Sequence, residues 1–165
     1  MPIAIEPLAP AALAPGAVTL VPAAPAHIAP IAGAMRAIDR CECAAMGYDP
    51  DWALRISLAG AAQAWTALVG DVPHAMFGVE SINAIERTGR IWFLGSDAVL
   101  RHGRALLTTG RRILAEMSGD YAELSNFVGA ENAAAIALLR RWGFTIEKEG
   151  RMIRDMPFVR FWRAG

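Results

Sequence analysis

Proline is distributed very unevenly along this 165-residue chain, and its distribution limits where regular structure can form. Seven of the ten prolines lie in the first 30 residues, and the only charged side chain before Arg36 is Glu6. Repeated prolines break helices, and the segment lacks the basic residues that begin a signal peptide. We therefore expect residues 1–16 to form an extended Pro/Ala-rich arm, neither a membrane span nor a secretion signal. Residues 17–165 should form one domain.

After the arm, short apolar runs alternate with longer stretches of helical spacing. Apolar runs predict strands at 17–21, 66–69, 74–82, 91–94, 121–128, 144–147 and 156–162. Apolar residues at three- and four-residue steps predict helices at 24–45, 50–65, 98–117 and 130–142. The order β-α-α-β-β-β-α-β-α-β-β predicts an α/β fold, a mixed central sheet with helices on both faces.

Charge and cysteine content exclude several classes of function. Sixteen Lys and Arg balance sixteen Asp and Glu, which argues against a protein that coats nucleic acid through bulk charge. Cys41 and Cys43 are too close in sequence for an unstrained disulfide, and the three histidines are scattered. We expect reduced thiols, no metal site, and a protein of a bacterial cytoplasm.

The segment from Asn132 to Phe144 carries a recognisable pattern. Asn132, Ala135, Leu138 and the pair Gly143-Phe144 follow the spacing Asn-x-x-Ala-x-x-Leu, then Gly-Phe. Together with the element order, this resembles the GNAT acetyltransferase superfamily. The resemblance implies a GNAT-like fold, acetyl-CoA as the acetyl donor, and an amine of a protein or small molecule as the acceptor.

A narrower set of motifs resembles the internal virion protein A family of short-tailed phages. The motifs are Met35-Arg36-x-x-Asp39-Arg40-x-Glu42, Ala75-Met-Phe-Gly-Val79, Trp92-x-Leu-Gly-Ser-Asp97 and Leu124-x-Asn-x-Val128-x-x-x-Asn132. This resemblance implies a structural or assembly protein of the virion with a degenerate acetyl-CoA site. Other virion proteins would be its partners, contacted through the arm and the basic–aromatic strand that contains Trp162. An oligomer is left open.

The resemblance places the acetyl-CoA pyrophosphate at the start of the 98–117 helix. Small residues there let backbone N–H groups approach the phosphates. The matching residues are Arg101, His102, Gly103, Arg104 and Ala105. Asn132 is a further candidate, although its place at the start of the 130–142 helix favours a helix cap. Leu100 stands where the superfamily has Gln or Arg, so a solvated basic helix start is the competing interpretation.

The catalytic groups are less well specified. Many GNAT enzymes use a tyrosine to protonate the departing thiolate, and Leu139 occupies that position. Weak candidates for base and water-positioning groups are Glu80, Ser125 and Asn126. The main hypothesis is therefore an inactive virion protein, and the alternative is an active N-acetyltransferase.

One charged cluster remains open to two interpretations. Arg36, Asp39 and Arg40 share one face of the 24–45 helix and are spaced for ion pairs. We expect a solvated face, with a functional or docking patch as the alternative.

Overall fold

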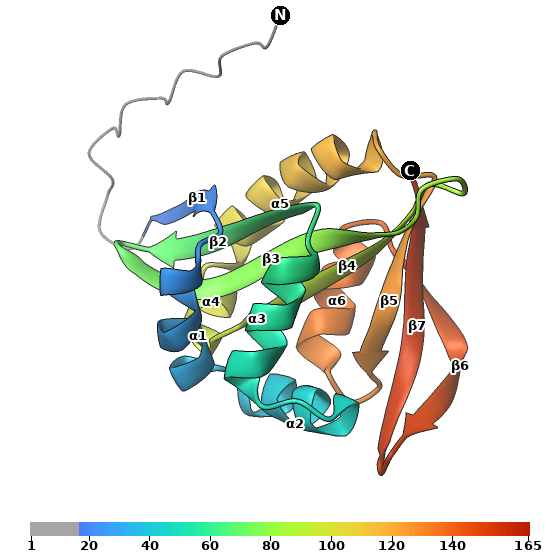
Figure 1. Ribbon diagram of the computed structural model, residues 1–165, viewed down its shortest axis with the longest axis horizontal. Helices are drawn as coiled ribbons and strands as arrows, with labels where there is room; N and C mark the ends of the chain where they lie inside the picture. The colour runs from blue at the N-terminus through green and yellow to red at the C-terminus, as the bar shows by residue number, and fades with distance from the viewer. Residues whose placement is uncertain (1–16) are drawn as a thin grey trace, which may run out of the picture.

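All seven predicted strands form and join one sheet in a computed structural model that describes residues 17–165 (Figure 1). The predicted arm, 1–16, lies outside the described residues. The strands are β1 (Val18–Pro22), β2 (Gln63–Val69), β3 (Val72–Asn83), β4 (Thr88–Gly95), β5 (Glu123–Gly129), β6 (Thr145–Ile153) and β7 (Met156–Ala164). Their order is β1-β2-β3-β4-β5-β7-β6, antiparallel throughout except for the parallel pair β4–β5.

Helices cover both faces of the sheet, as predicted. They are η1 (Pro25–His27), α1 (Ile28–Ala34), α2 (Ala37–Met46), α3 (Pro50–Gly60), α4 (Asp97–Arg101), α5 (Gly103–Ser118) and α6 (Ala133–Arg141). The first three α-helices pack on one face, while α5 and α6 pack on the other (Figure 1). The mixed α/β prediction is confirmed.

Burial on both faces explains why the central strands read as continuous apolar runs. In β3, Met76 packs among the residues of α1 and α3, whereas Phe77 joins the cluster formed by α5. Successive residues of a strand point to opposite faces, so β4 divides in the same way. Ile91 faces α5, and Trp92 faces α1 and α3.

Several helix ends follow the local sequence, but the predicted 50–65 helix was too long: α3 ends at Gly60, and residues 63–65 belong to β2. The Asp49 carboxylate accepts a hydrogen bond from the Trp52 amide at 2.9 Å and caps α3. The Asn132 side chain accepts from the Ala135 amide at 3.3 Å and caps α6. Gly143 has a φ of 83°, a conformation that glycine adopts without strain, and it ends the α6 segment.

Two of the predicted helices are each divided in two, and no pattern in the local sequence predicts either break. The 24–45 helix is interrupted because Met35 bridges Ser96 and the Arg36 amide donates to the Gly95 carbonyl at 3.0 Å. The 98–117 helix divides at His102. The first break has a consequence for function, since it ties the start of α2 to the end of β4.

The C-terminal strand, which was expected to contact partner proteins, lies inside the sheet and not at its edge. β7 runs between β5 and β6, and Trp162 pairs with residues of both neighbours. Phe158 and Phe161 are buried. Partner binding through this strand stays a prediction, but the exposed edge belongs to β6. Among residues 17–165, no helix is long and apolar enough to cross a membrane.

Candidate active site

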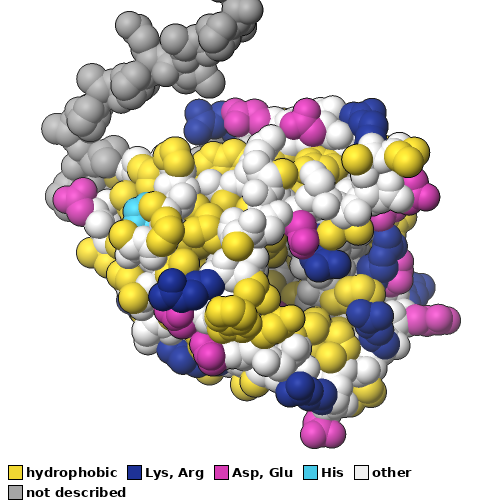
Figure 2. Space-filling model, viewed as in Figure 1, with side chains coloured by type: hydrophobic (Ala, Val, Ile, Leu, Met, Phe, Trp, Pro, Cys, Tyr) yellow, Lys and Arg dark blue, Asp and Glu magenta, His cyan; other side chains and the backbone are white. Residues whose placement is uncertain are grey.

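Strands β4 and β5 separate after a short parallel contact, and a cleft opens between them. Their pairing covers only Thr88–Arg90 with Glu123–Ser125. At the point of divergence, the Asn126 side-chain amide donates to the Ile91 carbonyl at 2.8 Å. Beyond it lies a cleft of about 800 Å³, bordered by α2, α3, α6 and the β6–β7 hairpin. Figure 2 shows this face hollowed between the α3 side and the β6–β7 side.

A buried ion pair lies on the wall that α2 contributes to the cleft. The Arg36 guanidinium donates to both carboxylate oxygens of Asp39, at 2.6 and 3.1 Å. The Gly95 amide, at the end of β4, donates to the same carboxylate at 3.2 Å. Both side chains are almost fully enclosed, so the expectation of a solvated face is wrong for this pair. Arg40 is exposed and bonds the carbonyls that end α1, Ala32 among them.

Glu42, one turn further along α2, makes the equivalent contact with β5. Its Oε1 accepts from the Gly129 amide at 3.0 Å and from the Asn132 side chain at 2.8 Å. Within residues 17–165 no donor bonds Oε2, and Glu42 is one of the residues that line the cleft. The two acidic residues of α2 thus hold the far ends of the two diverging strands.

Burial disfavours the charged forms of these carboxyl groups. It raises the pKa of Asp39, although the adjacent Arg36 opposes the shift. Burial also raises the pKa of Glu42 above its ordinary value of 4.5, and the charge of Asp39 adds to that effect. Glu42 forms no ion pair with any described residue, so its carboxylate is stabilised by two N–H donors instead of a cation. A carboxyl group with this environment is suited to accept a proton.

Cys43 takes no part in nucleophilic chemistry at neutral pH. Burial, reinforced by the charges of Asp39 and Glu42, raises the pKa of its thiol to about 12. The thiolate that would react is therefore scarcely populated. Cys41 is exposed, and both cysteines are free thiols, as expected. Among the described residues, no group of histidine, cysteine and acidic side chains is arranged to hold a metal ion.

The three predicted catalytic candidates all line the cleft, at its outer end. Glu80 is half-exposed and paired with Arg90 at 3.4 Å, which ties up its charge. Ser125 and Asn126 lie on β5 near the point of divergence. Sequence reasoning missed Glu42, which appeared only within the motif containing Arg36 and Asp39. Its three-residue spacing from Asp39, on the same helix face, was the signal that could have found it.

The predicted acetyl-CoA segment spans the junction of α4 and α5, and the structure leaves its role untested. Arg101 ends α4, His102 precedes α5, and Gly103 is the first residue of α5. A Cβ atom built on Gly103 meets no atom within 4 Å, so packing within the protein does not require glycine there. Leu100 and Leu139 line the cleft, and Leu139 is buried, so the thiolate-protonating tyrosine has no substitute at that position. Asn132 caps α6 and holds Glu42.

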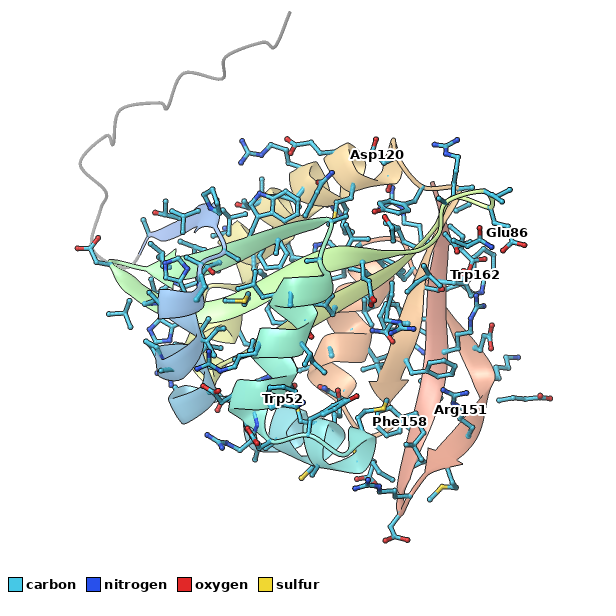
Figure 3. The ribbon with its side chains drawn as sticks, viewed as in Figure 1. Trp52, Glu86, Asp120, Arg151, Phe158 and Trp162 are labelled. Atoms are coloured by element: carbon cyan, nitrogen blue, oxygen red, sulfur yellow. The ribbon has the colours of Figure 1, made fainter. Side chains whose placement is uncertain are left out.

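The opposite side of the cleft is formed by the β6–β7 hairpin and β5. Arg151, on β6, places its guanidinium carbon 3.8 Å from the centre of the Phe127 ring. Arg160, on β7, bonds Glu123 at 2.6 Å and Glu147 at 2.8 Å. Figure 3 shows Arg151 on the β6–β7 side and Trp52 on α3, on opposite sides of the opening.

Comparison with known proteins identifies the fold. No family model matches the chain, and no curated protein matches it. Similar solved structures include spermidine N-acetyltransferase from Vibrio cholerae in complex with CoA and spermine (16% identity, 89% of this chain and 95% of that one, TM-score 0.61). Ard1 from Thermoplasma volcanium is also similar (14% identity, 89% and 97%, TM-score 0.65). So is an acetyltransferase of the GNAT family from Streptococcus pneumoniae (14% identity, 90% and 99%, TM-score 0.59).

These likenesses extend over nine-tenths of the chain and over nearly all of each other protein. The TM-scores of 0.59 to 0.65 show that the helices and strands are arranged alike over that length. The comparisons give no support to the resemblance to phage internal virion proteins. At these identities they establish the architecture alone: this chain has the fold of the GNAT acetyltransferases.

Proposed function

We propose that the protein is an N-acetyltransferase that transfers the acetyl group of acetyl-CoA to an amine, with Glu42 as general base. One observation carries this proposal: Glu42 lines the cleft where β4 and β5 separate, and within residues 17–165 no donor bonds its second carboxylate oxygen. The placement joins a proton acceptor to a space large enough for two reactants.

The residues that line the cleft fit the pantetheine arm of acetyl-CoA. Within residues 17–165, the β5-facing backbone edge of residues 92–94 pairs with no other strand, and neither does the facing edge of β5 from residue 126 onward. On that edge of β5 the Phe127 amide already bonds the Asn126 side chain and the Gly129 amide bonds Glu42, so the groups left without a partner lie mainly on β4. Backbone N–H and C=O groups in such a position need partners, and the amide groups of a pantetheine arm supply them. CoA is bound in the similar spermidine N-acetyltransferase. For the phosphates, the start of α5 at Gly103 offers backbone donors and nearby arginine charge.

When bound, acetyl-CoA supplies an acetyl group activated as a thioester, which passes to the amine nitrogen as the thiolate departs. Glu42 takes up the proton that the amine nitrogen releases. Asn132 and the Gly129 amide fix the carboxylate, so that only its free oxygen faces the reactants. The Asn126 side chain holds the point of divergence by bonding Ile91. Because Leu139 cannot donate a proton, we expect the thiolate to be protonated by water.

The virion interpretation rests on the narrower motifs and on the substitutions Leu100 and Leu139. These substitutions remove one polar contact and one acid, but leave the base and the cleft in place. Glu42 itself belongs to one of those motifs, and as a buried, uncompensated carboxylate it is costly to keep for structure alone. A protein carried in a virion with an intact acetyltransferase site would satisfy both sets of observations.

The test is acetyl-CoA-dependent acetylation of a panel of primary amines. The rate is measured as the release of the free thiol of CoA. We expect turnover by the unaltered chain, and a fall in kcat of about 10²- to 10⁴-fold in Glu42→Gln. Because the pKa of Glu42 is raised, the wild-type rate should fall as the pH drops through that pKa, and the variant should lose this limb. Absence of both acetyl-CoA binding and turnover would overturn the proposal.

A stability measurement separates loss of a base from loss of structure. Between the ordinary carboxyl pKa and the raised one, the folded protein binds more protons than the unfolded chain, so this group's contribution to stability falls as the pH rises. Glutamine keeps the Oε1 acceptor without the buried charge. Glu42→Gln should therefore be at least as stable as the wild type at pH 7. Glu116→Gln, an exposed change on α5, is the matched control and should retain full activity.

A further inference from the structure

Four arginines line the cleft, and three of them are neutralised by carboxylates. Arg36 pairs with Asp39, Arg90 with Glu80, and Arg160 with Glu123 and Glu147. Arg151 is the exception among the described residues: it is exposed, it lies over Phe127, and no carboxylate contacts it. The cleft therefore has one cation available for an anionic ligand group.

Arg151 and Glu42 both contact residues on the same face of β5. Leu124 and Val128 point toward α5 and α6, so Phe127 and Gly129 point to the opposite face, toward α2. Arg151 lies over Phe127, and Glu42 binds the amide of Gly129. Residues two apart on a strand are separated by roughly 7 Å. The two residues of β5 that Arg151 and Glu42 contact, Phe127 and Gly129, are thus two positions apart on the same face of one strand.

The rim of the cleft adds an apolar surface. Met46, Tyr48 and Ile82 each expose 39% or more of their surface, and all three line the cleft. Met46 and Tyr48 lie at the end of α2 and Ile82 near the end of β3, so apolar side chains are exposed at more than one place along the cleft and offer contacts to an apolar part of a ligand. The ligand that fits has an amine for Glu42, an anion for Arg151, and an apolar portion for the rim.

We propose that the acetyl acceptor is a free amino acid with an apolar side chain, whose carboxylate binds Arg151 and whose amine faces Glu42. This rests on the proposed acetyltransferase function. A polyamine carries only positive charges, and Arg151 would repel them. Within residues 17–165 the cleft offers such a ligand a single unpaired carboxylate, that of Glu42. The stacked guanidinium is presented as a planar donor that suits a carboxylate.

The test compares two acceptors that differ only in the carboxylate, L-phenylalanine and phenethylamine. In the unaltered protein, kcat/KM for L-phenylalanine should exceed that for phenethylamine by about 10- to 100-fold, the value of a charge-assisted contact. Arg151→Met should lower kcat/KM for L-phenylalanine by about that same factor and affect phenethylamine much less, so that the preference is lost, and Arg151→Lys should keep part of it. Arg112→Met, on the exposed side of α5, is the control and should keep the full preference.

Ligand-observed NMR measures the binding of L-phenylalanine and tests the inference independently of catalysis. Acetylation of amines without a carboxylate preference would overturn the inference and leave the proposed function standing. Binding that depends on Arg151, with no acetylation of any amine, would support the amino-acid site and overturn the proposed function. Equal losses for both acceptors in Arg151→Met would assign Arg151 a structural role and overturn the inference.

Discussion

Arg36 and Asp39 form a buried ion pair whose main contribution is to connect α2 to the sheet, since the attraction between the two charges adds little net stability. Removing two charges from water costs as much as their mutual interaction returns, unless other hydrogen bonds complete the site. Here the Gly95 amide supplies such a bond and links the carboxylate to the end of β4. The pair therefore fixes α2 against the sheet, which in turn positions Glu42 one turn later.

Removing the Asp39 carboxylate should destabilise the protein strongly. In Asp39→Ala the Arg36 guanidinium stays buried without its partner, which costs about 3–5 kcal/mol of unfolding free energy. Asp39→Asn keeps an acceptor for the Gly95 amide and should lose less. Urea denaturation measures both variants, with Arg55→Ala, which breaks an exposed pair on α3, as a control that should barely change the midpoint. A loss of under about 1 kcal/mol in Asp39→Ala would show that α2 is held by other contacts.

At the level of single residues, the sequence predicted which side chains pair with each other more reliably than it predicted which side chains are buried. The spacing of Arg36 and Asp39 indicated an ion pair, which is confirmed, and Asn132 was expected to cap its helix, which is also confirmed. Helical spacing says which side chains are neighbours on one face, but what covers that face depends on the rest of the chain. The role of Glu42 needed Gly129 and Asn132, about 90 residues away, and no local pattern contains that contact.

At the level of elements, the start of α5 decides whether the predicted phosphate-binding segment works as one. The helix has 16 residues, its cap residue His102 makes no capping hydrogen bond, and the space around Gly103 is open. Free amide groups and the positive end of the helix dipole favour any negative charge placed there. An aspartate at residue 103 would satisfy those groups from within the protein and compete with a phosphate for the same position.

Gly103→Asp should therefore change stability and binding in opposite directions. The acidic side chain at the first helical position should stabilise α5 by about 0.3–1 kcal/mol through the dipole. The same charge should weaken CoA binding by about tenfold or more, as measured by calorimetry. Thr108→Asp adds an equal charge to the exposed side of α5, more than a turn away, and should leave affinity unchanged. Unchanged affinity in Gly103→Asp would move the phosphates away from this helix.

Element type was predicted more reliably than element limits. All seven strands were anticipated, because strands with two covered faces or with clear turns carry strong local patterns. The breaks at Met35–Arg36 and His102 were not, since the first depends on backbone pairing with the end of β4. Tertiary contacts of this kind override helical propensity, and they are made by residues distant in sequence.

At the level of the whole molecule, the site exists because the sheet is incompletely joined. Three residue pairs connect β4 to β5, and beyond them the two halves of the sheet are held by side chains of α2 and by Asn126. The element order predicted the fold, but the extent of this divergence is set by register and twist, which strand patterns do not specify. The resemblance therefore predicted an acetyl-CoA site, whereas the position of Glu42, the proposed proton acceptor, required the structure.

A ligand that bridges β4 and β5 where they diverge should slow the hydrogen exchange of their backbone amides. If CoA pairs with the unpaired edges of β4 and β5, amides in segments 91–95 and 126–128 should exchange more slowly when it binds. Their slowing should reach about 100-fold at a free CoA concentration 100 times the Kd. Amides on the outer edge of β6 exchange by local fraying and should not respond, which provides the internal reference. Protection confined to α5, with the two strand edges unaffected, would place CoA on the surface of the protein and deprive the cleft of its acetyl donor.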